Sequence, residues 1–307
     1  MATVDNTTLE TELEELRDSR TFTAKAWDTF KRMPLGAFGA LVVILMILAA
    51  ILAPWVSPYD PELNNFEAML SPPSWEYLLG TDQFGRDLFT RIIYGAQTAL
   101  FVGFSCAFIG ATAGLVLGVM SAYFGGTFDL IFQRIMDVFL AFPLIILALA
   151  VVATFGTKGI FFGTPYENVI IAITIPFIPR CARVVRSNAL SIREIPYVDA
   201  ARALGFNHAR IILRHMVPNV MAPYLIMLTA FVGQAILLEA SLSYLGLGVQ
   251  EPTPAWGLML QGGAEEYAES APWVPIYPGL AITVAVFGFN LFGDAVRDIL
   301  DPKLRQQ

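Results

Sequence analysis

A short charged segment, residues 197–219, carries the side chains best suited to bind another protein. It lies between two long apolar runs and reads YVDAARALGFNHARIILRHMVPN. Its arginines, with Arg210 among them, can pair with an acidic partner surface, and its adjacent alanines leave a smooth surface that can enter a narrow cleft. The candidate contact residues are Asp199, Ala200, Ala201, Arg202, Gly205, Arg214, His215 and Pro218.

The same segment carries helix start and stop signals. Residues 198–204 favour a helix, and Gly205 stands where a C-terminal cap would end it. Asn207 can cap a second helix over residues 208–216, and Pro218 suits the first turn of the next apolar run. The pattern predicts helix, turn, helix and membrane span. The alternative is an amphipathic loop attracted to anionic lipid headgroups.

Two acids lie in or near apolar runs. An acid inside a membrane is costly and is a functional candidate by default. Glu239 could line a polar pathway, or it could bond to Ser241 or Ser243. Asp137 follows Arg134 by three positions, so we expect a local ion pair there.

The sequence lacks the motifs of an enzyme. No G-x-x-x-x-G-K-[ST] stretch occurs, so any nucleotide must be bound by another chain. No catalytic triad or carboxylate pair stands out. Two histidines and two cysteines also lack the spacing of metal ligands; they are His208, His215, Cys106 and Cys181. We expect no enzymatic activity, no cofactor and no metal on this chain.

The composition indicates a membrane protein. The chain of 307 residues is 56% apolar and only 15% charged, whereas soluble domains carry about 25% charged residues. Apolar runs of about 20 residues match the hydrocarbon thickness, and lipid requires them to be helical. Five runs are clear and a sixth, which contains Pro176 and Pro179, is weaker; they are 35–56, 98–124, 138–155, 220–238 and 276–292, then 168–185. We expect an all-α polytopic protein with six membrane-spanning helices.

Charge distribution predicts the orientation. With the N-terminus in the cytoplasm, only Arg86, Arg91 and Lys158 of the 19 Lys and Arg residues fall outside. Because positive residues favour the cytoplasmic side, both termini are expected there. The predicted parts are a cytoplasmic tail over 1–34, a first span over 35–57, a periplasmic loop over 58–96, a five-helix core over 97–297 with the loop 195–219, and a cytoplasmic tail over 298–307.

Aromatic residues mark the expected membrane surfaces. Trp27 and Phe30 share one face of a short helix that we expect to lie in the inner interface. Trp55, Trp256 and Trp273 are expected at the outer interface, where amphipathic rings collect.

A row of glycines in the second run predicts a tight helix contact. Gly110, Gly114 and Gly118 recur every four positions and form a doubled G-x-x-x-G pattern. Small residues at this spacing let another helix approach closely. The contact could be made within the chain or with another chain.

At residues 199–218 the sequence resembles the inner-membrane permease subunits of ABC importers. Their cytoplasmic loop has the pattern E-A-A-x3-G-x9-I-x-L-P. The spacing matches throughout, with Asp199, His215 and Val217 as departures. The Arg-His-x-x-Pro-Asn ending is similar to the dipeptide, oligopeptide and nickel branch. Further resemblances lie at 80–87 (GTDQFGRD), 242–248 (LSYLGLG), 254–257 and 298–304.

This resemblance implies a type I ABC importer permease fold in a prokaryotic inner membrane. It implies that the loop helix docks on an ATPase subunit, and that ATP binds only to partner subunits. The implied partners are a second permease in a heterodimer, two ATP-binding subunits, a periplasmic or lipid-anchored binding protein and membrane lipid, with no nucleic acid. Dipeptides and oligopeptides lead as cargo, while nickel chelates, glutathione and sugars stay open. The alternatives are an ion-gradient-driven transporter that uses Glu239, and a membrane-embedded enzyme.

Overall fold

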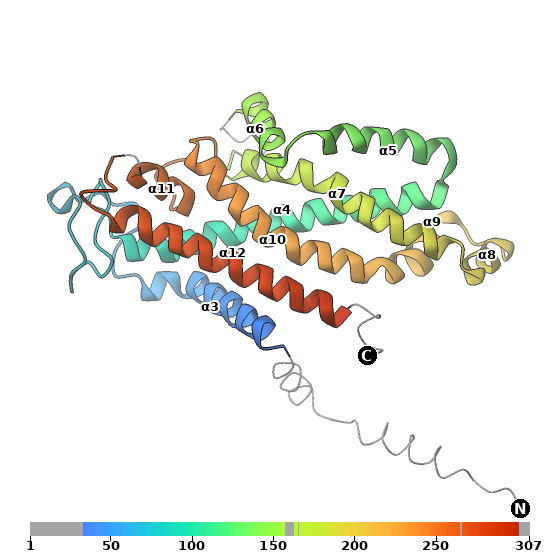
Figure 1. The fold of residues 1–307 in the computed structure, drawn as a ribbon, viewed down its shortest axis with the longest axis horizontal. Helices are drawn as coiled ribbons and strands as arrows, with labels where there is room; N and C mark the ends of the chain where they lie inside the picture. The colour runs from blue at the N-terminus through green and yellow to red at the C-terminus, as the bar shows by residue number, and fades with distance from the viewer. Residues whose placement is uncertain (1–32, 157–162, 165, 265, 301–307) are drawn as a thin grey trace, which may run out of the picture.

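The computed structural model describes residues 33–156, 163–164, 166–264 and 266–300. Within these ranges the chain is helical, and the only pairing of the β type is an isolated bridge between Thr81 and Asp87. Long helices form an elongated bundle (Figure 1). The loop after the first span and the short helix α11 lie at one end, and α8 and α9 lie at the other.

In the part of the chain that the structure describes, five helical stretches are long and apolar enough to cross a membrane. They are α3 (Pro34–Val56), α4 (Leu88–Phe124), α7 (Glu167–Arg193), the stretch His208–Tyr244 that ends in α10 (Met221–Tyr244), and α12 (Trp273–Leu300). The shorter elements are η1 (Phe66–Ala68), α5 (Gly126–Ala141), α6 (Leu144–Phe155), α8 (Pro196–Ala203), α9 (His208–Ile211), the π-helical turn η2 (Ile212–Met216), the 3-10 turn η3 (Val217–Val220) and α11 (Trp256–Ala264).

The predicted third span, 138–155, is not one straight helix. The chain bends by 91° between α5 and α6, so the pair forms a sixth span only as a broken one. Phe142 adopts extended backbone (φ −87°, ψ 137°) because the proline at 143 disfavours helical geometry in the residue before it. By contrast, Pro176 and Pro179 lie inside the continuous helix α7.

Some predicted boundaries also differ. α4 begins at Leu88, inside the predicted loop 58–96, because Asp87 caps it by accepting a hydrogen bond from the Thr90 N–H at 2.8 Å. α12 continues to Leu300, beyond the predicted limit of 297. The predicted interfacial helix near Trp27 and the tail after 300 lie outside the described residues.

The glycine row of α4 packs against α7 within this chain. A Cβ on Gly110 would lie 2.8 Å from the Cβ of Phe177, and one on Gly114 would lie 2.5 Å from the Cβ of Cys181. A Cβ on Gly118 would lie 2.5 Å from the carbonyl oxygen of Ala182. These separations are too short for real side chains, so the glycines permit the close crossing of the two helices at the core.

Candidate coupling site

Residues 197–219 fold as a helix, a tight turn and a second helical segment, as predicted. α8 is a separate short helix at the end of the bundle (Figure 1), and Gly205 reverses the chain after it with φ of +76°. The side chain of Asn207 then caps α9 by accepting a hydrogen bond from the Arg210 N–H at 2.8 Å. From there the turns η2 and η3, the latter with Pro218, lead directly into α10.

Buried side chains and α4 hold this loop in place. Val198 and Met216 are fully buried. The Tyr123 hydroxyl, at the C-terminal end of α4, lies 2.7 Å from Nδ1 of His208, and the Arg202 guanidinium lies 5.3 Å from the centre of the same tyrosine ring. The loop is therefore braced against α4.

A second brace joins the start of α8 to the turns η2 and η3, which precede α10. The Tyr197 hydroxyl donates to the carbonyl oxygen of His215 at 3.3 Å. The Asn219 amide donates to that carbonyl at 2.7 Å and to the Tyr197 hydroxyl at 3.0 Å. The ring of Phe206 stacks on His215, and the Arg210 guanidinium lies 4.1 Å from the centre of the same Phe206 ring. His215, predicted to contact a partner, thus contributes to internal bracing.

The structure distinguishes the two members of the alanine pair. Ala200 is exposed, whereas Ala201 is only 4% exposed and packs against this chain. Asp199 and Arg202 are exposed and pair with each other at 3.1 Å. Arg214 and Gly205 are also exposed.

Two apolar residues of the outward face were missed by the sequence reasoning. Leu204 is 74% exposed and Leu213 is 68% exposed, in a segment whose other outward side chains are mostly polar. Their outward position follows from the structure, in which Val198 and Ile211 take buried positions of α8 and α9. Exposed leucines at the tip of a braced loop are suited to entering an apolar groove.

The intramembrane acid makes a local contact. Glu239 is 1% exposed, and its carboxylate accepts a hydrogen bond from the Ser243 hydroxyl at 2.7 Å. Ser241 instead donates to the carbonyl of Leu237 at 2.8 Å. Of the two serines considered as partners, only Ser243 binds the acid.

The ion pair predicted for Asp137 is present but is not the whole arrangement. Asp137 lies 3.8 Å from Arg134 on α5, and it also pairs with Arg183 on α7. Among the described residues, no three His, Cys, Asp or Glu side chains come together as metal ligands.

At the opposite end of the bundle, ion pairs join the loop before α4 to the loop after α10. Arg86, 4% exposed, donates through Nε to Asp82 at 2.7 Å and through Nη1 to Glu251 at 2.6 Å. Burial lowers the pKa of Arg86, but the hydrogen bond to Glu251 and the charges of Asp82 and Glu251 outweigh burial and raise that pKa above its usual value. Arg91 is fully buried and donates to the carbonyl of Pro61 at 2.7 Å.

The fold is that of a helical membrane protein with several spans. A solved structure of the MetNI methionine ABC transporter, in an inward-facing conformation, matches 70% of this chain and 98% of its own chain at a TM-score of 0.55 and 20% identity. The chain therefore has the type I ABC importer permease fold.

The family follows from the sequence matches. Residues 114–306 match the family described as the binding-protein-dependent transport system inner membrane component, and residues 21–73 match the N-terminal TM domain of oligopeptide transport permease C. This chain belongs to the binding-protein-dependent transport system inner membrane components. It is a transport permease, and ATP hydrolysis belongs to separate subunits.

Two relatives match over nearly their full lengths. A Brucella abortus protein, whose name provisionally assigns it to a peptide transport system as a permease, is 43% identical over 88% of both chains. The glutathione transport system permease protein GsiD of Escherichia coli O6:K15:H31 is 43% identical over 91% of this chain and 90% of its own. These likenesses give no support to the ion-gradient-driven alternative.

Proposed function

We propose that this chain is one of two permease subunits in an importer of short peptides. Two ATPase subunits bind the ATP, this chain binds no nucleotide itself, and a binding protein delivers the cargo from outside. The names of the relatives support this cargo, because a peptide system and a glutathione system both carry short peptides. The loop with α8 faces the cytoplasm, along with both termini, because the basic residues gather on that side.

The observation that carries the proposal is the outward face of the braced loop. Leu204 and Leu213 are exposed on a loop held rigidly by Tyr123 and by the Tyr197–Asn219 contact. Burying a leucine side chain contributes about 2 kcal/mol. A groove on an ATPase subunit that covers both leucines would therefore bind the loop firmly, with Asp199 and Arg214 available for polar contacts at its rim.

The same braces explain how docking moves the membrane helices. α8 follows α7 after two residues, contacts the end of α4 through Arg202 and Tyr123, and is tied to η3 through Tyr197 and Asn219. A push on α8 is therefore transmitted to α4, α7 and α10 together. We propose that closure of the ATPase subunits produces this push and changes which end of the path is open.

The experiment uses the full complex in proteoliposomes. Leu204→Asp places a charge on the docking face without touching a buried contact, and Leu63→Asp is the matched control because Leu63 is 72% exposed in the loop at the opposite end. We expect Leu204→Asp to lose the ATPase subunits during purification and to lose ATP-dependent uptake of labelled trialanine. Leu63→Asp should retain the ATPase subunits. Retention of both properties by Leu204→Asp would refute the docking role, while docking without trialanine uptake in the wild type would refute only the cargo.

A further inference from the structure

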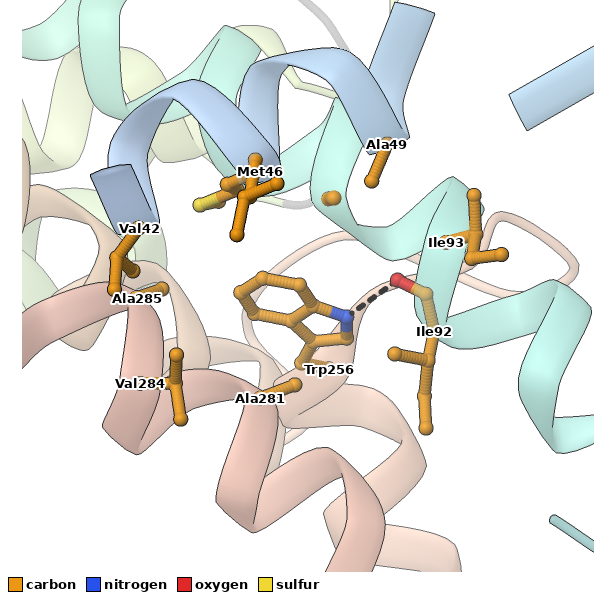
Figure 2. Close-up of a pocket in the computed structure, with 11 residues that line it drawn as sticks. Val42, Met46, Ala49, Ile92, Ile93, Trp256, Ala281, Val284 and Ala285 are labelled. Atoms are coloured by element: carbon orange, nitrogen blue, oxygen red, sulfur yellow. Dashed lines mark hydrogen bonds between the residues drawn. The ribbon is translucent and has the colours of Figure 1, made fainter. Parts of the chain in front are cut away.

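An apolar cavity opens on the membrane-spanning part of the bundle, away from the coupling loop. Its volume is about 280 Å³, and helices α3, α4, α11 and α12 line it (Figure 2). Its walls include Val42 and Met46 of α3, Ile92 of α4 and Val284 of α12, with the indole of Trp256 between them. Every lining side chain is apolar apart from the indole N–H.

The packing of α3 on α12 explains why the space exists. Near the start of α3 the two helices touch closely, because a Cβ on Gly39 would lie 2.6 Å from the backbone nitrogen of Phe292. Further along, four of the positions on α3, α4 and α12 that line the gap are alanines, and their small side chains do not fill it. These alanines are Ala49, Ala96, Ala281 and Ala285.

Trp256, which the sequence predicts at the outer interface, is buried in the structure and forms one wall of the cavity. It is only 4% exposed, and its N–H donates to the carbonyl of Ile92 at 2.9 Å (Figure 2). Since that hydrogen bond satisfies its polar group, the ring presents only carbon to the cavity. An apolar cavity without free polar groups does not hold ordered water.

The cavity borders lipid. Leu45 and Val284, which line it, are 56% and 52% exposed on helices that cross the membrane. The volume is slightly below the range of about 300–1,000 Å³ typical of pockets for drug-sized ligands, and a helix of about 10–12 Å diameter cannot enter it. An empty space here would leave its lining without dispersion contacts that a neighbouring hydrocarbon chain can supply.

We propose that this cavity binds one acyl chain of a membrane phospholipid, which inserts between α3 and α12 and lies against Trp256. The acyl chain belongs to a lipid of the leaflet nearer the loop end of the bundle, because Ile92, which lines the cavity, is one turn from the first residue of α4. The bound chain completes the contact between the first span and the remaining helices. This inference does not depend on the cargo or on the docking loop.

The test follows the fluorescence of Trp256 in the full complex. The complex is placed in nanodiscs of phosphatidylcholine with either plain or dibrominated acyl chains, because bromine quenches an indole that it touches. Subtracting the emission of a Trp256→Phe complex isolates the signal of Trp256 from the other tryptophans. We expect this signal to lose most of its intensity in the brominated lipid, although the residue is buried.

Filling the cavity should reverse the quenching. Ala281→Leu, or Ala49→Leu from the opposite wall if the first variant does not fold, should restore the Trp256 signal in brominated lipid. Leu280→Phe is the matched control, because Leu280 is 54% exposed on α12 and does not line the cavity; its quenching should persist. Equal Trp256 emission in the two lipids, or quenching that survives both filling variants, would overturn the proposal.

Discussion

Arg86 donates two hydrogen bonds to the carboxylate of Glu251, which lies 165 positions further along the chain, at 2.6 and 3.1 Å. The buried Arg91 lies 3.6 Å from the same carboxylate and 3.7 Å from Asp82. Two arginines and two acids thus join the loop before α4 to the loop after α10. Planar guanidinium groups bind carboxylates in this two-bond geometry, which fixes the relative position of the two loops.

Removing the acid from this cluster should loosen the loop end. Glu251→Ala leaves two arginines with Asp82 as the remaining acid of the cluster. Loss of a charged hydrogen bond costs about 2 kcal/mol, a value lowered from that of a fully buried pair because Glu251 is 41% exposed. We expect a lower thermal unfolding midpoint for the complex, measured by tryptophan fluorescence. Glu67→Ala, an exposed acid in η1, should leave the midpoint unchanged; equal midpoints for both variants would contradict the role of the cluster.

The crossing of α4 on α7 should not tolerate a side chain at Gly114. A Cβ there would lie 2.5 Å from Cys181 and 2.9 Å from the backbone nitrogen of Ala182. Gly114→Ala should destabilise the protein by about 1–3 kcal/mol, and Gly114→Leu should prevent folding of the isolated chain. Size-exclusion chromatography of this chain alone separates this effect from a loss of partner binding. Val116→Leu, on the exposed side of α4, should behave as wild type.

α5 should be released from α7 when its ion pairs are lost. Asp129 accepts from Nε of Arg186 at 2.6 Å, and Asp137 pairs with Arg183. Each partly exposed pair contributes about 1 kcal/mol or less. In the double variant Asp129→Asn/Asp137→Asn we expect faster amide hydrogen exchange across α5 and unchanged exchange in α4. Asp294→Asn, an exposed acid on α12, is the control; unchanged exchange in α5 would show that apolar contacts alone hold it.

The brace between α4 and α9 should affect coupling more than stability. Tyr123→Phe removes the hydroxyl that lies 2.7 Å from Nδ1 of His208 but keeps the ring beneath Arg202. One such hydrogen bond is worth about 1 kcal/mol. We expect fewer peptides transported per ATP hydrolysed, measured in proteoliposomes with both rates followed together. Tyr244→Phe, at the far end of α10, should keep the wild-type number of peptides transported per ATP. An unchanged number in Tyr123→Phe would show that this brace does not contribute to coupling.

Much of the helical organisation was predictable because its signals are local. The hydrophobic lengths of the runs that became α3, α4, α7, α10 and α12 indicate their membrane crossings. Caps such as Gly205 and Asn207 act within one turn of their helices, so the turn between α8 and α9 was predicted correctly. The start of α4 was missed because Arg91 interrupts the apolar run, and only its burial against the loops reveals that the helix continues.

The prolines of this chain have different effects on the helices, and the sequence near them does not predict which effect occurs. Phe142 is 53% exposed on the edge of the bundle, and there the chain breaks before the following proline. Pro176 and Pro179 are buried against other helices, and α7 passes through them without a break. Neighbouring helices can compensate for the hydrogen bonds that a proline removes, so the outcome depends on packing as well as on the proline itself.

The amino-acid sequence by itself determined that this is a helical membrane protein with a capped loop at residues 197–219 and the motifs of a permease family, because hydrophobic length and capping act between near neighbours. Only the tertiary structure decided that the glycines of α4 face α7, that Ala201 points inward while Leu204 points outward, that Glu251 binds Arg86, and that Trp256 lines a cavity. These outcomes depend on contacts between residues far apart in the chain, and such contacts are settled by how whole helices pack together.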